Sequence, residues 1–271
     1  MMEKLFVLSQ YLTPQLSLSR LAGRLADTTG TPALRSRFVR WFINRYGVNM
    51  SEAENSDPDA YGSFNDFFTR ALKPGSRPIE GNENTLVSPV DGCVSQLGSI
   101  SGGRIFQAKG QSFSLLELLG GDQQRADLFA EGEFATIYLA PGDYHRIHMP
   151  MAGQLREMVH VPGRLFSVNP ATAANVPNLF ARNERVVCMF DTAAGPIALV
   201  LVGAMIVGSV ETPWAGIVAP GDGGVSQQSY DDEQALKFAR GEEIGRFRLG
   251  STVVMMMPKG RVQWSDAQKP G

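Results

Sequence analysis

The sequence predicts an α+β fold in which N-terminal amphipathic helices precede a mainly antiparallel β body. Apolar residues recur at helical spacing through the first fifty residues. Short β-prone runs, separated by Gly, Pro and Asp turns, begin near residue 86. The composition, 43% hydrophobic and 19% charged, is that of a globular protein and excludes disordered, collagen-like and coiled-coil chains. The 271 residues suffice for one large domain or two small ones.

Two helices are predicted within the first fifty residues. Leucines mark the first helix on both sides of Pro14, namely Leu5, Leu8, Leu12, Leu16, Leu18, Leu21 and Leu25. Gly30 ends this pattern, and Thr31 and Pro32 suit the N-cap and first turn of the second helix. One side of the second helix carries Leu34, Phe38, Trp41 and Phe42.

The charge of this segment differs from that of the rest of the chain. Residues 1–50 hold seven basic and two acidic side chains, a net charge of +5, whereas the remainder holds 18 basic and 25 acidic side chains. Two interpretations stay open: the helices pack on the core, or they lie on an anionic membrane surface. Nucleic-acid binding is disfavoured, because the basic residues alternate with apolar ones and the body is acidic.

The elements that follow are predicted from caps and from β-prone runs. A serine with a glutamate three residues later marks two helix starts, Ser51…Glu54 and Ser114…Glu117. Residues 63–72 predict a short Phe-rich helix, which ends before Pro74. Strands are expected at residues 136–139, 186–190, 197–202, 205–210 and 252–257. The apolar residues 197–210 are too few to span a membrane and are interpreted as a pair of buried strands, and residues 220–233 as a surface loop.

Two of the three histidines, His145 and His148, are close together in the sequence. Their Gly- and Pro-containing flanks favour an irregular loop that aims both rings at one place. A zinc site would need a third ligand such as His160, and no familiar spacing provides one, so no metal is predicted. Without further motifs, both histidines could equally be surface residues. The two cysteines make neither a disulfide scaffold nor a multi-cysteine zinc site and suit a reducing compartment.

Two other short patterns are weak when taken alone. Ser88-Pro89-Val90-Asp91-Gly92 has ordinary turn chemistry. Leu249-Gly250-Ser251-Thr252 would occur by chance in many loops, but it directly precedes a β-prone run.

In their order, seven stretches of the chain resemble the phosphatidylserine decarboxylases of the bacterial, pyruvoyl-dependent type. These stretches are residues 64–68, 89–92, 107–110, 143–150, 162–169, 178–185 and 249–252. The resemblance implies conversion of phosphatidylserine to phosphatidylethanolamine and CO2 through a Schiff base to a pyruvoyl group. That group, formed from Ser251, would be the electron sink that decarboxylation requires, with no metal or other external cofactor.

The resemblance also implies a role for each site residue. Ser251, with His148 as base and Asp91 as its partner, would cleave the chain after Gly250. The products would be a β chain, residues 1–250, and an α chain, residues 251–271. His145 would assist decarboxylation and protonation. Ser167 and Val168 would contact the substrate.

The organisation that follows is a helical, membrane-associating region, residues 1–80, and a β-rich catalytic domain, residues 81–271. The two chains of the cleaved protein would stay together as a heterodimer, and two such units would form a homodimer. We expect a peripheral protein at the cytoplasmic face of the bacterial cell membrane, bound to anionic lipid and not to nucleic acid.

Two alternatives stay open. The first is a Ser-His-Asp lipid hydrolase, which is weakened because no Gly-x-Ser-x-Gly elbow surrounds Ser251. The second is a non-catalytic membrane lipid-binding module, which leaves the His, Asp and Gly-Ser patterns unexplained.

Overall fold

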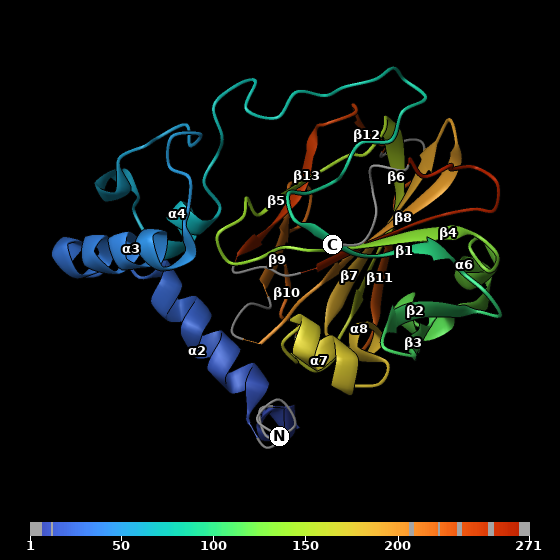
Figure 1. The fold of residues 1–271 in the computed structure, drawn as a ribbon, viewed down its shortest axis with the longest axis horizontal. Coiled ribbons are helices and arrows are strands. Elements are labelled where there is room, and N and C mark those ends of the chain that lie inside the picture. The colour runs from blue at the N-terminus through green and yellow to red at the C-terminus, as the bar shows by residue number, and fades with distance from the viewer. Residues whose placement is uncertain are drawn as a thin grey trace.

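The computed structural model describes residues 7–11, 13–205, 209–221, 223–231, 235–248 and 252–265. Figure 1 shows helices α2 to α4 standing at one side of a β-rich body. The helices are α2 (Gln15–Asp27), α3 (Pro32–Tyr46), the 3₁₀ helix η1 (Pro58–Ala60), α4 (Phe64–Phe68), α5 (Leu115–Leu118), α6 (Gln123–Asp127), α7 (Pro170–Asn175) and α8 (Leu179–Arg182). Residues 7–11 are also helical.

The strands form three sheets. They are β1 (Cys93–Ser99), β2 (Arg104–Ala108), β3 (Gln111–Ser114), β4 (Glu133–Tyr138), β5 (Arg146–His148), β6 (Gly153–Val161), β7 (Arg185–Thr192), β8 (Gly195–Val202), β9 (Ser209–Thr212), β10 (Gly216–Ala219), β11 (Ser226–Ser229), β12 (Leu236–Phe238), β13 (Glu243–Arg248) and β14 (Thr252–Met257). The largest sheet has the order β1-β4-β14-β8-β7-β6-β11, and β12 also pairs with β6. A second sheet has the order β10-β9-β13-β5, and β2 and β3 form a hairpin. All pairings of the named strands are antiparallel, so the predicted α+β fold class is confirmed.

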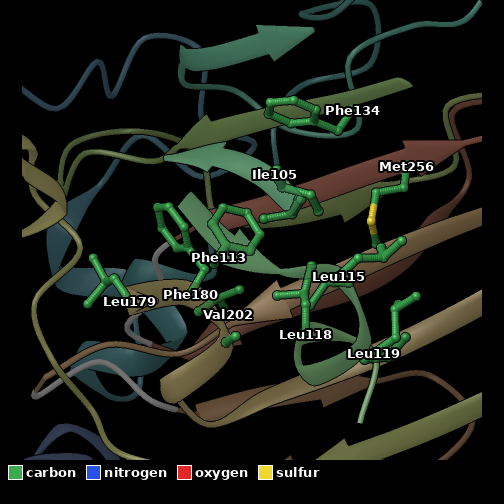
Figure 2. Packing of buried hydrophobic residues seen from close by; sticks show 14 of the residues in the cluster. Ile105, Phe113, Leu115, Leu118, Leu119, Phe134, Leu179, Phe180, Val202 and Met256 are labelled. Carbon is green, nitrogen blue, oxygen red and sulfur yellow. The ribbon is translucent and has the colours of Figure 1, made fainter. Parts of the chain in front are cut away.

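The central strands of the large sheet are buried on both faces, and β14 illustrates why. Alternate residues of a strand point to opposite faces. Val254 and Met256 of β14 therefore belong to the core cluster formed with α5 to α8 and the β2–β3 hairpin, part of which Figure 2 shows. Val253 and Met255 belong instead to a cluster shared with the β10-β9-β13-β5 sheet. An unbroken apolar run such as Thr252–Met257 thus suits a central strand covered by a layer on either side.

The N-terminal helices have a core of their own. Val39 and Phe42 of α3 pack with Phe64, Phe67 and Phe68 of α4. Pro32 begins α3, as predicted, although the Thr31 side chain makes no capping hydrogen bond; Gly47 ends the helix in a left-handed conformation at φ 65°. Ser63 caps α4, which ends at Phe68 and so is shorter than predicted. No helix among the described residues is both long enough and apolar enough to cross a membrane.

The prediction of a helix start at Ser51…Glu54 is wrong, while the matching one at Ser114…Glu117 is confirmed. The Ser51 hydroxyl donates to the Asn49 side chain at 2.7 Å, and Ala53 forms a β-bridge with Leu72. The Ser114 hydroxyl instead accepts from the Glu117 N–H at 3.2 Å and caps α5. The same sequence pattern therefore starts a helix at Ser114 but not at Ser51, where the serine side chain bonds Asn49 instead.

Three further predictions need correction. Residues 197–210 contribute to two strands that do not pair with each other, because β8 lies in the large sheet and β9 in the four-stranded one. The exposed strand β11 lies within the predicted loop at residues 220–233. The predicted irregular loop around the histidines is a strand over Arg146–His148, where β5 pairs with β13.

Candidate active site

A large apolar cavity lies where the N-terminal helices meet the β body. Its volume is about 770 Å³. From the helices, it is lined by α2, α3 and α4 residues that include Leu25, Leu34, Phe38, Trp41, Phe42 and Phe68. From the body, it is lined by Tyr138, Leu139, Pro141, Ser167, Val168, Ala204 and Met205. Arg35 is the one charged side chain among the described residues of this lining.

The ends of two strands bracket the predicted cleavage point. Gly250 and Ser251 lie outside the described residues, between Arg248, which ends β13, and Thr252, which begins β14. Thr252 is paired with Tyr138, whose side chain lines the cavity. The chain that follows the Gly250–Ser251 bond therefore starts beside this cavity.

Charged groups tie the end of β13 to the helices. The Arg248 guanidinium forms an ion pair with Asp27, the last residue of α2, at 2.5 Å. Asp27 also accepts a hydrogen bond from Asn65 of α4 at 2.9 Å. The C-terminal end of α2 and the segment leading to the cleavage point are thus held together.

Asp91 lies beside the same end of the sheet. Its neighbour Gly92 precedes β1, whose first residue Cys93 is also paired with Tyr138. A Cβ at Gly92 would lie only 2.4 Å from the Tyr138 carbonyl oxygen, so only glycine permits this approach. The Asp91 carboxylate accepts from the Arg77 Nε at 2.9 and 3.0 Å and from Nη2 at 2.7 Å.

The main chain brings His148 next to this Asp91 segment, but different groups hold the two side chains. The His148 N–H donates to the Pro89 carbonyl at 2.8 Å. The His148 ring bonds Tyr144 through Nε2 at 3.0 Å and the Gly241 carbonyl through Nδ1 at 2.8 Å. Within the part of the chain that the structure describes, no hydrogen bond joins Asp91 to His148.

These contacts fix the proton positions on the His148 ring. A carbonyl oxygen only accepts, so Nδ1 carries the proton and donates it to Gly241. In the neutral ring Nε2 then offers a lone pair, to which the Tyr144 hydroxyl can donate. Burial raises the pKa of Tyr144 to about 12, which keeps this hydroxyl protonated at neutral pH. If His148 acts as the predicted base, Tyr144 lies on the nitrogen that would take the proton.

His145 has a different environment. Its ring is fully buried against Phe68, with centroids 4.0 Å apart, and Nδ1 donates to the Asp143 carbonyl at 2.8 Å. Nε2 is buried without a hydrogen-bond partner among the described residues. Burial, opposed by the Asp143 hydrogen bond and reinforced by Arg70, lowers the pKa of His145 to about 3. At neutral pH this imidazole is therefore uncharged.

The two residues predicted to contact the substrate lie next to each other at the cavity. Ser167 and Val168 lie in its lining. His160, considered above as a third zinc ligand, instead bonds Glu184 through Nε2 at 2.8 Å. No group of three or more His, Cys, Asp or Glu residues suited to a metal occurs in the described ranges.

Sequence reasoning missed Tyr144 and Arg77. Tyr144 lies within the motif that contains both histidines, four residues before His148. Its role could have been suspected from that spacing only if the residues had been helical, since i and i+4 share a helix face. Arg77 and Asp91 are separated by fourteen residues of irregular chain, and no periodic pattern relates them.

Known proteins match almost the whole chain. Residues 64–270 match the protein family described as phosphatidylserine decarboxylase, and residues 5–47 match a family described as PSD. A phosphatidylserine decarboxylase proenzyme of Marinobacter nauticus is 70% identical over 268 residues, 99% of this chain and 94% of the relative. Proteins of the same name from Hahella chejuensis and Stutzerimonas stutzeri are 61% and 54% identical, over 98% and 100% of this chain and 90% and 91% of theirs.

Proposed function

The chain belongs to the phosphatidylserine decarboxylase family, and from that premise we propose that it is a carboxy-lyase activated by its own cleavage. It converts phosphatidylserine to phosphatidylethanolamine and CO2, using a pyruvoyl group made from Ser251. The observation that carries this proposal is the pairing of Thr252 with Tyr138, whose side chain lines the apolar cavity. Thr252 is thereby placed next to a residue that lines a cavity of a size and polarity suited to part of a lipid.

Self-cleavage begins with the Ser251 hydroxyl. Its oxygen attacks the Gly250 carbonyl carbon while its proton passes to His148 Nε2. The Gly250–Ser251 C–N bond then breaks, His148 returns the proton to the departing Ser251 nitrogen, and the peptide has become an ester with a free amine. Elimination breaks the ester, releasing residues 1–250 with a new C-terminal carboxylate and leaving dehydroalanine at position 251. Addition of water and loss of ammonia then convert this residue to pyruvoyl.

Asp91 supports this step through its surroundings. Arg77 and Glu52 form one ion-pair cluster with Asp91, and these carboxylates raise the pKa of the guanidinium. The cluster stabilises the turn whose Pro89 carbonyl accepts from the His148 main chain. We therefore infer that Asp91 acts mainly by fixing the position of the strand that carries His148.

The described residues fit a pyruvoyl group at position 251. Two buried polar atoms, Thr252 Oγ1 and His145 Nε2, have no hydrogen-bond partner in the described ranges. The Thr252 hydroxyl could donate to a carbonyl of the group, and His145 Nε2, an acceptor, suits the amine of the substrate. When formed, the group supplies an electron sink for the carbanion that loss of CO2 leaves. We infer that His145 Nε2 relays a proton from water to the carbanion carbon, because burial disfavours the charged ring and makes it give the proton up again.

The cavity and the charge pattern support a lipid substrate and a membrane location. Leu25, Leu34, Phe38 and Trp41 line the cavity and are each about half exposed or more. Such a surface suits acyl chains, and Arg35 suits the phosphate of the headgroup. We propose a peripheral protein at the cytoplasmic face of the bacterial membrane, held by the basic N-terminal region, with two cleaved heterodimers forming a homodimer.

The test combines the intact mass with the activity of the purified protein. We expect a 21-residue α chain whose N-terminus is blocked to Edman degradation and reacts with hydroxylamine, together with CO2 release from phosphatidylserine. Ser251→Ala should stay one chain and release no CO2, while a serine control away from the cavity, Ser226→Ala on the exposed strand β11, should behave as wild type. An active protein that remains one chain would refute the pyruvoyl mechanism and favour a Ser-His-Asp hydrolase.

A further inference from the structure

Two glutamines of the N-terminal segment are buried against the body. Gln10 is 1% exposed and Gln15 is 3% exposed, although Gln is mostly found on protein surfaces. Gln10 Oε1 accepts from the Ser167 N–H at 2.8 Å, and Gln15 Oε1 accepts from the Leu165 N–H at 2.9 Å. Both amides thus hold the main chain of the segment that carries cavity-lining Ser167.

The other half of each amide is also bonded. Gln15 Nε2 donates to the Gln10 carbonyl at 2.7 Å, and Gln10 Nε2 donates to Thr172 Oγ1 at 3.3 Å. Donors and acceptors are consistent with one orientation of each amide. Because every partner is buried or partly buried, moving either side chain would leave polar groups unsatisfied.

A third buried amide holds the same segment from the opposite side. Asn183 Oδ1 accepts from the Phe166 N–H at 3.1 Å, and its Nδ2 donates to the Phe166 and Gly203 carbonyls, each at 2.8 Å. Gly203 directly precedes Ala204 and Met205, which also line the cavity. Residues 165–167 are therefore fixed between the N-terminal segment and the sheet.

Gln15 is also the first residue of α2, and the far end of α2 forms the opposite side of the cavity. Leu25 and Ala26 of α2 lie in the lining, as Ser167 and Val168 do. The leucines between these two ends, Leu18 and Leu21, are exposed. One helix thus connects an exposed apolar surface with both sides of the cavity.

We propose that Gln10 and Gln15 are positioning residues that set the geometry of the substrate-binding wall at Ser167. The proposal rests on the proposed function, because it takes the cavity to hold phosphatidylserine. The glutamines act through the main chain of Leu165 and Ser167 and touch no reacting atom. They make the N-terminal helices part of the substrate site, so that the orientation of α2 determines how tightly the lipid is held.

Gln10→Met and Gln15→Met test this role, since methionine keeps the size of the side chain and removes its hydrogen bonds. The assay is decarboxylation of dihexanoyl phosphatidylserine below its micelle concentration by the self-cleaved enzyme. We expect KM to rise on the order of tenfold, with kcat within about twofold of wild type and unchanged self-cleavage. Gln10→Glu, which keeps the acceptor for Ser167 N–H, should recover most of the wild-type KM.

Gln107→Met is the matched control. Gln107 is equally buried and makes three hydrogen bonds, to the Ala173, Val176 and Leu179 main chains, but it does not line the cavity. The Gln107→Met variant should have a lower Tm and an unchanged KM. Thermal unfolding of all variants measures the change in stability. If the wild type is active and both glutamine variants have the same KM as the wild type and the control, this proposal is overturned while the proposed function stands. A wild type that releases no CO2 overturns the proposed function and this proposal with it.

Discussion

At the residue scale, the hydroxyl of Tyr144 bonds Nε2 of His148, the residue proposed as the base of self-cleavage. The two rings stack with centroids 5.6 Å apart, and the hydroxyl donates to Nε2. The opposite nitrogen is fixed by the Gly241 carbonyl. Orientation of the base thus depends on two uncharged partners, while Asp91 is held by Arg77.

Tyr144→Phe should slow self-cleavage. The variant keeps the stacked ring but removes the donor to His148 Nε2, so the imidazole loses one of its two orienting hydrogen bonds. We expect the rate to fall roughly tenfold, less than the ~10²–10⁴-fold contribution of a general base itself. Cell-free synthesis followed by denaturing electrophoresis measures the rate of chain separation. Tyr230→Phe, which removes a buried hydroxyl without a partner in the described ranges, should cleave normally; equal rates in both variants would make the Tyr144 hydroxyl dispensable.

His145 predicts a pH dependence of stability. Its pKa is lowered to about 3 in the folded protein, against 6.5 as the ordinary value. Between these values the unfolded chain binds a proton that the folded protein excludes, so the free energy of unfolding falls as the pH falls. We compare two uncleaved proteins, Ser251→Ala and Ser251→Ala with His145→Gln. Between pH 7 and pH 5, the free energy of unfolding should fall by about 2 kcal/mol more in the protein that keeps His145. Urea unfolding at both pH values measures the difference, and equal losses in the two proteins would refute a buried neutral His145.

The sequence allowed the site residues to be named but not their partners. His145, His148 and Asp91 were predicted from short motifs matched to a family, and their roles stay predictions. The contacts of Asp91 with Arg77, and of His145 with Phe68, join segments of different local structure. Such contacts are decided by tertiary packing, on which a local motif carries no information.

At the scale of elements, α2 carries the exposed apolar surface that the sequence pattern predicted. The pattern alone left open whether these helices pack on the core or meet a membrane. The structure shows a buried and an exposed apolar side: Ala26 of α2 and Val39 and Phe42 of α3 pack inward, while Leu18, Leu21 and Trp41 stay exposed. Contact of the exposed side with a membrane stays a prediction. Helical spacing could not tell which apolar residues are buried and which are exposed, because all of them belong to one wide apolar stripe.

Leu18→Glu with Leu21→Glu should weaken membrane binding. These leucines are 41% and 54% exposed and do not line the cavity, so the substitution removes apolar insertion without changing the substrate site. Burial of a leucine is worth about 1.5–3 kcal/mol, and the affinity for vesicles of phosphatidylglycerol and phosphatidylcholine should fall at least about tenfold. Leu128→Glu, exposed by 46% at the end of α6, is the control. Vesicle sedimentation measures binding, and an unchanged affinity would mean that α2 contacts protein only.

At the scale of the whole molecule, the predicted cleavage separates two sheets without breaking a strand pairing. Arg248 ends β13 in the four-stranded sheet, and Thr252 begins β14 in the eight-stranded one. β14 is paired on one side with β4 and on the other with β8, and its residues are buried on both faces. The predicted antiparallel body is therefore what allows a short α chain to remain in place. The sequence could not reveal this central position, because strand order depends on contacts between distant segments.

The cleaved protein should consequently unfold as a complex of two chains. Val253, Val254, Met255 and Met256 are buried, so the α chain should stay bound through size-exclusion chromatography and separate only when the fold is lost. Unfolding then releases two chains from one particle, so by mass action the Tm of the cleaved protein rises with protein concentration. Uncleaved Ser251→Ala unfolds as one chain, and its Tm should not depend on concentration unless the homodimer dissociates in the same step. Calorimetry over a hundredfold concentration range measures Tm for both proteins. Any effect of homodimer dissociation on Tm is the same in Ser251→Ala, so the difference between the two proteins is due to the chain cleavage. An equal concentration dependence in both proteins would show that the α chain is not released on unfolding.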